Sequence, residues 1–249
     1  MEGGRILRNS QIIILGICIA AATIISSVIL SGGFLKVMKF TREQITVTGS
    51  ATSQIKSDYI VWMGAIIKRE TDLKVAYQNL KMDLEKTKEY LLSKGVLEKE
   101  LIVYPVVTET VYKKNEKGND TNDIQGYRLT QAVEIRSHDV ATVTKVARES
   151  TELIDQNIQF ESGAPEYFYT KLDELKVEML ARATENARQR AESMARATGN
   201  RIGFMRSAKM GVFQITPITS TDVSDWGMND TTSLDKKVMS VVTVSFAIE

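Results

Sequence analysis

The sequence predicts an α+β fold, in which three helices pack on a largely antiparallel sheet and one transmembrane helix precedes them. Three observations lead to this prediction. An apolar run without any charge covers residues 11–30. After it, segments with the two-residue alternation of strands are mixed with segments that have the spacing of helices. Hairpin-like strand pairs mixed with helices in this way are typical of helices packed on an antiparallel sheet.

The apolar run is long enough to cross a membrane. Residues 11–30, written as a helix, span about 30 Å, which is the thickness of the hydrocarbon core of a bilayer. A cleaved signal peptide is the alternative, with "SGG" at 31–33 as the cleavage site. The run is longer than the apolar region of about 7–15 residues in such peptides, and no A-x-A site follows it. We therefore favour an uncleaved anchor.

The chain accordingly divides into an N-terminal tail (1–10), a transmembrane anchor or uncleaved signal (11–30), a linker (31–42) and a folded domain (43–249). The positive-inside rule does not orient the anchor, because basic residues flank both of its ends. These residues are Arg5 and Arg8 on one side and Lys36, Lys39 and Arg42 on the other.

The charge balance bears on the partners of the domain. The net charge of the chain is +1, and residues 1–40 hold +3 (four basic residues against Glu2), which leaves −2 for the rest. A domain that binds a polyanion normally has a basic excess. We therefore expect no nucleic-acid partner.

The first half of the domain reads as two strands, a helix and a further strand. Residues 45–50 alternate and end near Gly49, and residues 59–68 are apolar on both alternations, as in a strand that is covered on both faces. Residues 101–112 form the next strand, in which Pro105 predicts an edge or a bulge. The helix between them ends at Gly95, and its apolar positions are Leu73, Ala76, Tyr77, Leu80, Leu84 and Leu91.

The second half begins with a polar hairpin tip at 113–123, followed by a cleanly alternating strand at 126–137. Ser137 or Asp139 is placed to cap the next helix. A short strand (158–163) and a long helix (about 169–198) follow, and two strands (202–215 and 237–248) close the chain.

The long helix carries alanine at every fourth position. Residues 173–199 hold five acidic and five basic side chains, many at i,i+4 spacing. This pattern predicts a solvated helix face whose charges pair with one another, and not a surface that binds nucleic acid. A coiled coil needs bulky residues in the repeat. The repeat predicts a ridge of small residues that lets the helix lie flat on the sheet, and Gly199 ends it. The ridge consists of Ala183, Ala187, Ala191 and Ala195.

These segments together resemble the SIMPL domain, a bacterial cell-envelope family of poorly defined function. The similar stretches are "ITVTG" followed by "SDYIVWMGAI", "GYRLTQAVEI" and "LDELKVEMLARATENARQRAESMARATG". Their order and spacing carry the resemblance, which covers about residues 43–249. Ser50 and Ala51 depart from the glycine or acidic residue that commonly follows "VTG". Members usually have a cleaved signal peptide and are free in the periplasm, whereas the long apolar run here predicts an anchored protein.

The resemblance implies a location outside the cytoplasmic membrane, a tendency to form large homo-oligomers and an association with oxidative-stress tolerance. It offers no catalytic residues. The sequence itself also yields no catalytic, cofactor-binding or metal site, since Cys18 and His138 are the only residues of their types. Ser137, His138 and Asp139 are consecutive and cannot converge as a triad does, so capping explains them better.

Two segments remain as candidate binding regions. The aromatic cluster at 167–170 is either core or a shelf for a ligand. Residues 216–235 are long for a connection in a compact domain and carry large apolar residues in an otherwise polar setting. Four of them, by our expectation, either fold back on the core or meet another subunit, and we favour the interface; these four are Ile218, Val223, Trp226 and Met228.

We therefore expect a protein without enzymatic activity that is anchored in the cytoplasmic membrane by a single pass through residues 11–30, with its domain on the extracytoplasmic side and itself as its partner. The alternative is an extracytoplasmic binding module for a small molecule or a peptide, which would use the aromatic cluster or the 216–235 loop.

Overall fold

The computed structural model describes residues 3–249, so the first two residues of the predicted tail lie outside the described residues. The chain divides into two compact units. One holds the residues up to Ser50 together with Arg182–Gly211 and Val241–Glu249, and the other holds Ala51–Ala181 and Val212–Ser240. Three elements contribute residues to both units: β1 (Gln44–Lys56), α4 (Leu172–Ala197) and β11 (Asp235–Ile248).

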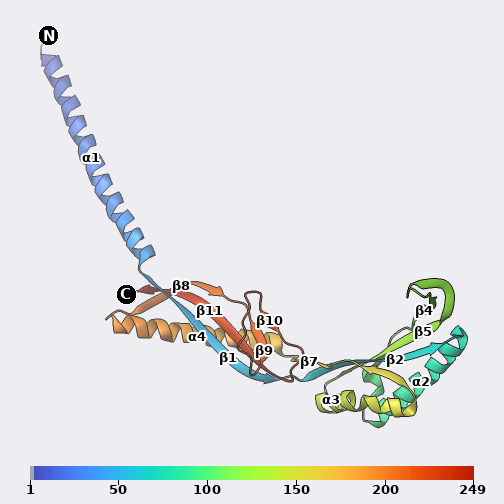
Figure 1. Cartoon of the computed structure of the whole chain (residues 1–249). Coiled ribbons are helices and arrows are strands. Elements are labelled where there is room, and N and C mark those ends of the chain that lie inside the picture. Colours follow the sequence, from blue (N-terminus) through green and yellow to red (C-terminus); the bar gives the residue numbers. More distant parts are fainter. Residues whose placement is uncertain (1–2) are drawn as a thin grey trace. The chain divides into compact units, whose positions relative to one another are not determined.

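The predicted α+β class is confirmed. Residues 3–249 contain four α-helices and two sheets, and one apolar helix precedes the domain. Helix α1 (Gly3–Arg42) runs without a break through the predicted tail, anchor and linker (Figure 1). Within the described part of it, Leu15–Phe34 has a mean hydropathy of 2.1 and is apolar and long enough to cross a membrane. Helix α1 is therefore compatible with a membrane anchor.

A six-stranded sheet belongs to the second unit. Its strands are β2 (Tyr59–Glu70), β3 (Leu101–Val103), β4 (Val107–Lys114), β5 (Asp120–Ser137), β6 (Gln159–Ser162) and β7 (Glu166–Phe168). The order is β3-β5-β2-β6, with β4 also on β5 and β7 also on β2, and all of these pairs are antiparallel. The central pair, β2 with β5, runs from Ile60 opposite Ser137 to Glu70 opposite Tyr127.

Two turns of this sheet agree with the sequence. The predicted strand at 101–112 is interrupted between β3 and β4, where Pro105 has no N–H to donate. The tip between β4 and β5 is a hairpin, in which the side-chain oxygen of Asn115 accepts from the amides of Lys117 and Asn119, each at 3.0 Å. Gly118 takes a φ of +79° there.

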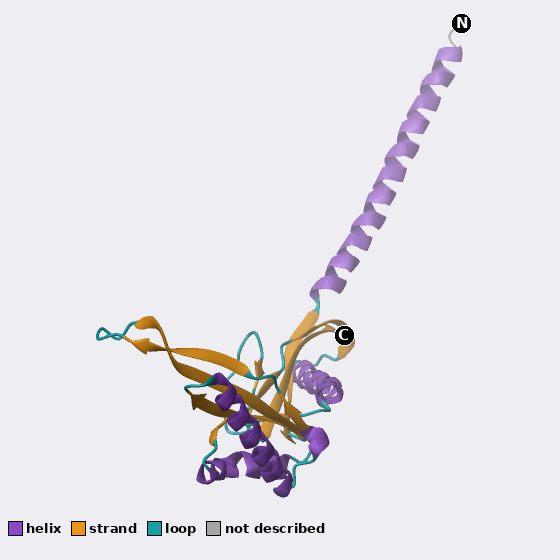
Figure 2. Cartoon of the chain, turned by 90° about the vertical axis from the view of Figure 1, so that its right-hand side faces the viewer, coloured by secondary structure: helices purple, strands orange, loops and turns teal. Residues whose placement is uncertain are grey.

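Helices α2 (Leu73–Ser93) and α3 (Val140–Glu149) pack on one face of the six-stranded sheet (Figure 2). Two short 3₁₀ helices, Glu98–Glu100 and Ser150–Gln156, follow them. Asp139 caps α3 by accepting from the amide of Thr142 at 3.0 Å, as predicted. The core between helices and sheet includes large, fully buried side chains, among them Trp62, Ile60, Ile66, Leu80, Leu91, Leu129 and Ile135.

The remaining strands form a five-stranded sheet of order β1-β11-β9-β10, with β8 also on β11. Its other strands are β8 (Ile202–Met210), β9 (Gln214–Pro217) and β10 (Met228–Asn229). The single strand expected at 202–215 is therefore wrong. β8 pairs with Val242–Ile248 of β11, and β9 pairs with Lys236–Met239 of the same strand. The expected strand is therefore interrupted, and its two parts pair with different halves of β11.

Candidate functional site

The alanine repeat of α4 lies on its buried face. Ala183, Ala187 and Ala191 are fully buried and Ala195 nearly so. A Cβ added to Gly49 of β1 would come within 2.2 Å of the carbonyl oxygen of Ala183. The backbones of strand and helix are thus in direct contact, an approach that larger side chains at these positions would prevent. The ridge is a packing device and offers no chemistry.

The opposite face of α4 carries ion pairs between its own residues. Arg188 lies 2.9 Å from Glu185 and 2.5 Å from Glu192, and Arg196 lies 3.3 Å from Glu192. Exposed pairs at this spacing contribute little to stability. These four side chains are thus paired within one helix.

The 216–235 loop holds the four candidate interface residues, which the structure places differently. Trp226 is 94% exposed and Val223 is 66% exposed, whereas Ile218 is 38% exposed. Met228 is partly buried, because it lies in β10, which pairs in parallel with β9. The segment is thus less irregular than its sequence indicates, since it contains a short strand, while Trp226 and Val223 do not fold back on the core.

Hydrogen bonds hold this loop in place. Gln214 of β9 donates its side-chain amide to the carbonyl of Ser224 at 2.6 Å and accepts from the amide of Ser224 at 3.3 Å. Lys237 donates to the carbonyl of Ser220 at 2.5 Å. Gly227 supplies a φ of +86° in the turn that follows Trp226. The exposed indole of Trp226 therefore lies in a turn whose conformation these hydrogen bonds hold.

The aromatic cluster at 167–170 and the end of the same loop enclose a small cavity of about 80 Å³. Both belong to the second unit. Its walls are the aromatic residues Tyr167, Phe168 and Tyr169, the aliphatic residues Ile55, Leu172 and Ile215, and the polar residues Asn229, Thr231 and Lys236. The structure thus brings together two segments that the sequence offered as separate alternatives.

Lys236 is the unusual member of this wall, because it is only 3% exposed. Its Nζ donates to the main-chain carbonyls of Tyr167 and Asp230, each at 2.5 Å. Burial lowers the pKa of Lys236, and the charge of Asp230 opposes this. Sequence analysis missed this residue, although the alternation that buries Val238 and Ser240 on β11 places Lys236 on the same side. The neighbouring residues in "DKK" do not distinguish Lys236 from an ordinary exposed lysine.

Two carboxylates fix the segments around the cavity. Asp58 accepts from the amide and from the hydroxyl of Thr170, both at 2.7 Å. Asp230 accepts from the amide and the hydroxyl of Thr232, both at 2.8 Å. Burial raises the pKa of both carboxyls, but these hydrogen bonds outweigh it, so both pKa values lie below the usual range. Both groups are structural anchors.

Residues 45–246 match the family described as SIMPL, protein of unknown function (DUF541). The chain belongs to the SIMPL family. The resemblance seen in its motifs is thereby confirmed, and the match covers most of the domain predicted at 43–249. Curated proteins give no match to this SIMPL chain.

Several solved structures share partial likeness with the SIMPL chain. A de novo designed protein, Foldit4, is 23% identical, with a TM-score of 0.21, and the match covers 42% of this chain and 93% of the design. A hydantoinase/carbamoylase family amidase from Burkholderia ambifaria is 10% identical (TM-score 0.25, 46% of this chain). One from Burkholderia phymatum is also 10% identical (TM-score 0.27, 52% of this chain). The SIMPL chain spans 29% and 34% of these two amidases. Likenesses this weak carry no argument on fold or activity.

The remaining polar candidates of the SIMPL chain are structural. Ser137 donates to Glu100 at 2.9 Å and accepts from the amide of Asp139, while the Nδ1 of His138 lies 3.0 Å from the carbonyl oxygen of Asp58. These three side chains serve three different contacts and form no triad. No group of three or more His, Cys, Asp or Glu side chains that could hold a metal ion occurs among the described residues.

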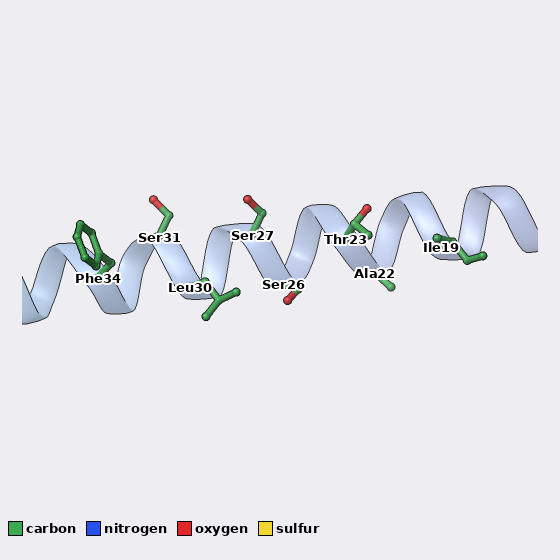
Figure 3. Close-up of a pocket in the computed structure, with 8 residues that line it drawn as sticks. All are labelled: Ile19, Ala22, Thr23, Ser26, Ser27, Leu30, Ser31 and Phe34. Carbon is green, nitrogen blue, oxygen red and sulfur yellow. The ribbon is translucent and has the colours of Figure 1, made fainter.

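A shallow hollow also lies along α1, between Ile19 and Phe34. All of its lining residues come from this one helix, so it is the bare flank of the helix and encloses nothing (Figure 3). Figure 3 shows the hydroxyls of Thr23, Ser27 and Ser31 on one side of it. The hydroxyl of Thr23 donates to the carbonyl of Ala20 at 2.9 Å, which satisfies it within the helix.

Proposed function

We propose that this SIMPL protein is anchored in the cytoplasmic membrane by α1 and assembles with copies of itself outside that membrane, without enzymatic activity. The extracytoplasmic side and the link to oxidative-stress tolerance rest on the family resemblance. The apolar stretch Leu15–Phe34 supports the anchor, since it is long and apolar enough to cross a bilayer.

Trp226 is the observation that carries the proposed assembly. An indole that is 94% exposed leaves its whole apolar surface in water, and Val223 nearby in the chain adds to it. Tryptophan is enriched at the centres of interfaces, where the ring fills a pocket of the partner. The hydrogen bonds from Gln214 already order the loop, so little conformational entropy is lost when a second copy covers the ring.

The test of assembly is Trp226→Ala in the full-length protein, solubilised in detergent. We expect the variant to dissociate at a higher concentration than the wild type, because the free energy of association weakens by roughly 2 kcal/mol or more per contact. Its circular dichroism spectrum should be unchanged. Light scattering measures the mass on dilution. Tyr77→Ala is the matched control, because Tyr77 is an exposed aromatic residue on α2. Equal masses for wild type and Trp226→Ala at every dilution would refute this role of the loop.

The anchor and its orientation need a separate experiment. We expect N-terminal sequencing of the protein from membranes to find residues 11–30 retained. Protease added to intact spheroplasts should digest the domain. A mature N-terminus near Phe34 would refute the anchor, and a domain that survives the protease would refute its extracytoplasmic side.

A further inference from the structure

The cavity between the aromatic cluster and the end of the loop has one charged group in its wall. Among its described lining residues, Lys236 is the only one that bears a charge. The carboxylate of Asp230 does not line the cavity, and Thr232 and Ser233 hold it in a turn. The ammonium group of Lys236 is therefore the one charged group in the described wall, and the carboxylate of Asp230 acts on it from outside that wall.

The hydrogen bonds of this ammonium group are incomplete. A charged lysine has three N–H donors. Two of them are directed to the carbonyls of Tyr167 and Asp230, and the described residues offer no acceptor to the third. No carboxylate forms an ion pair with Lys236 within the described part of the chain. A buried charge in this condition is expensive unless a further acceptor, preferably an anion, completes it.

Apart from Lys236, the wall is mostly apolar, and Asn229 and Thr231 are its two uncharged polar members. Ile55, Leu172 and Ile215 provide aliphatic surface, and Tyr167 to Tyr169 provide aromatic surface. The volume of about 80 Å³ is well below the roughly 150 Å³ of an apolar cavity that accommodates benzene. A ligand of this cavity therefore has only a few heavy atoms, with an anionic end and an apolar end.

We propose that this cavity binds a short-chain aliphatic carboxylate. Its carboxylate accepts the third N–H of Lys236, and its alkyl end packs against Ile55, Leu172 and Ile215. The carboxylate supplies both the missing acceptor and a countercharge to the ammonium group, which a water molecule or an uncharged ligand does not. This site is independent of the proposed assembly through Trp226.

The experiment uses the full-length protein in detergent micelles, titrated with acetate, propionate, butyrate and hexanoate by ligand-observed NMR. We expect saturable binding of propionate, at least about tenfold tighter than that of its uncharged isostere propionamide, because the bond to Lys236 is charge-assisted. Hexanoate should bind more weakly than propionate, because it exceeds the cavity. Equal affinity for propionate and propionamide, or no saturable binding of propionate, would overturn the proposal.

Three variants locate the site. Lys236→Met removes the charge with a side chain of similar length and should abolish propionate binding. Lys237→Met is the matched control, because Lys237 also donates to a main-chain carbonyl but does not line the cavity, and it should bind like the wild type. Ile215→Phe fills the cavity and leaves the lysine in place, so it should also lose binding. If Lys236→Met does not fold, propionate binding that persists in Ile215→Phe is by itself sufficient to refute this site.

Discussion

Gly49 of β1 lies directly against Ala187 of α4. A Cβ added to Gly49 would be 2.4 Å from the amide nitrogen of Ala187 and 2.7 Å from its Cβ. Contacts under 3.0 Å with backbone atoms cannot be relieved by a rotamer change. Strand and helix can approach this closely because Gly49 has no side chain and Ala187 has only a methyl group.

Gly49→Ala tests this contact from the strand. We expect the variant to unfold at a lower urea concentration than the wild type, because the added methyl group forces the strand away from the helix. The free energy of unfolding should fall by about 1–3 kcal/mol. Circular dichroism of the solubilised protein measures the transition. Ser50→Ala, at the neighbouring exposed position, should leave it unchanged. A stable Gly49→Ala variant would show that β1 moves freely relative to α4.

Ala187→Leu and Ala191→Leu test the same contact from the helix. Each should destabilise by about 1–3 kcal/mol through overpacking of a fully buried position. Ala181→Leu is the matched control, because Ala181 is an exposed alanine of the same helix, where the effect should stay within about 0.5 kcal/mol. Melting temperatures of the three variants decide the point. If all three variants melt at the same temperature, the alanine face of α4 is not tightly packed.

Arg69 of β2 lies directly opposite Arg128 of β5 in the sheet register. Arg69 makes no ion pair among the described residues, while Arg128 reaches Glu109 at 3.6 Å. Like charges directly opposite each other destabilise an antiparallel pair. Arg69→Glu should therefore stabilise the protein by about 0.2–1 kcal/mol at low ionic strength, and less in high salt.

Chemical denaturation at two salt concentrations measures this effect. Arg69→Gln, which removes the repulsion without adding an attraction, should lie between Arg69→Glu and the wild type. If Arg69→Glu proves less stable than Arg69→Gln, the attraction to Arg128 that the register predicts is not formed.

Asp58 predicts a pH dependence of stability. Burial raises the pKa of its carboxyl, but hydrogen bonds from Thr170 outweigh it, so the pKa in the folded state lies below its usual value of 3.8. The unfolded state then binds this proton more readily. The stabilisation is fully present above the unfolded pKa and is lost as the pH falls through the lower folded pKa.

We therefore expect Asp58→Asn to be less stable than the wild type at pH 7 and the difference to shrink on acidification below about pH 4. Urea midpoints across this range measure the difference. Asp155→Asn, at an exposed position, serves as the control for general effects of charge. A gap between Asp58→Asn and the wild type that does not change with pH would mean that the Asp58 carboxylate contributes no pH-dependent stability.

Local patterns were sufficient for much of the fold. The apolar run, the α+β class, the hairpin at Asn115, the interruption at Pro105 and the cap at Asp139 were predictable. Each depends on the conformational preferences of a few neighbouring residues or on a periodicity within one element. The family, too, was recognisable, because its motifs keep their order along the chain.

The sequence by itself thus determined most of the helices and strands and the alanine face in the second half of α4. The tertiary structure alone decided that β8 and β9 share one partner strand, that Lys236 is buried beside Tyr167 while Lys237 is not, and that Trp226 stays in water. These outcomes depend on which distant segments pair and cover one another. No window of neighbouring residues contains that information, because the burial of a side chain is a property of the partner that covers it.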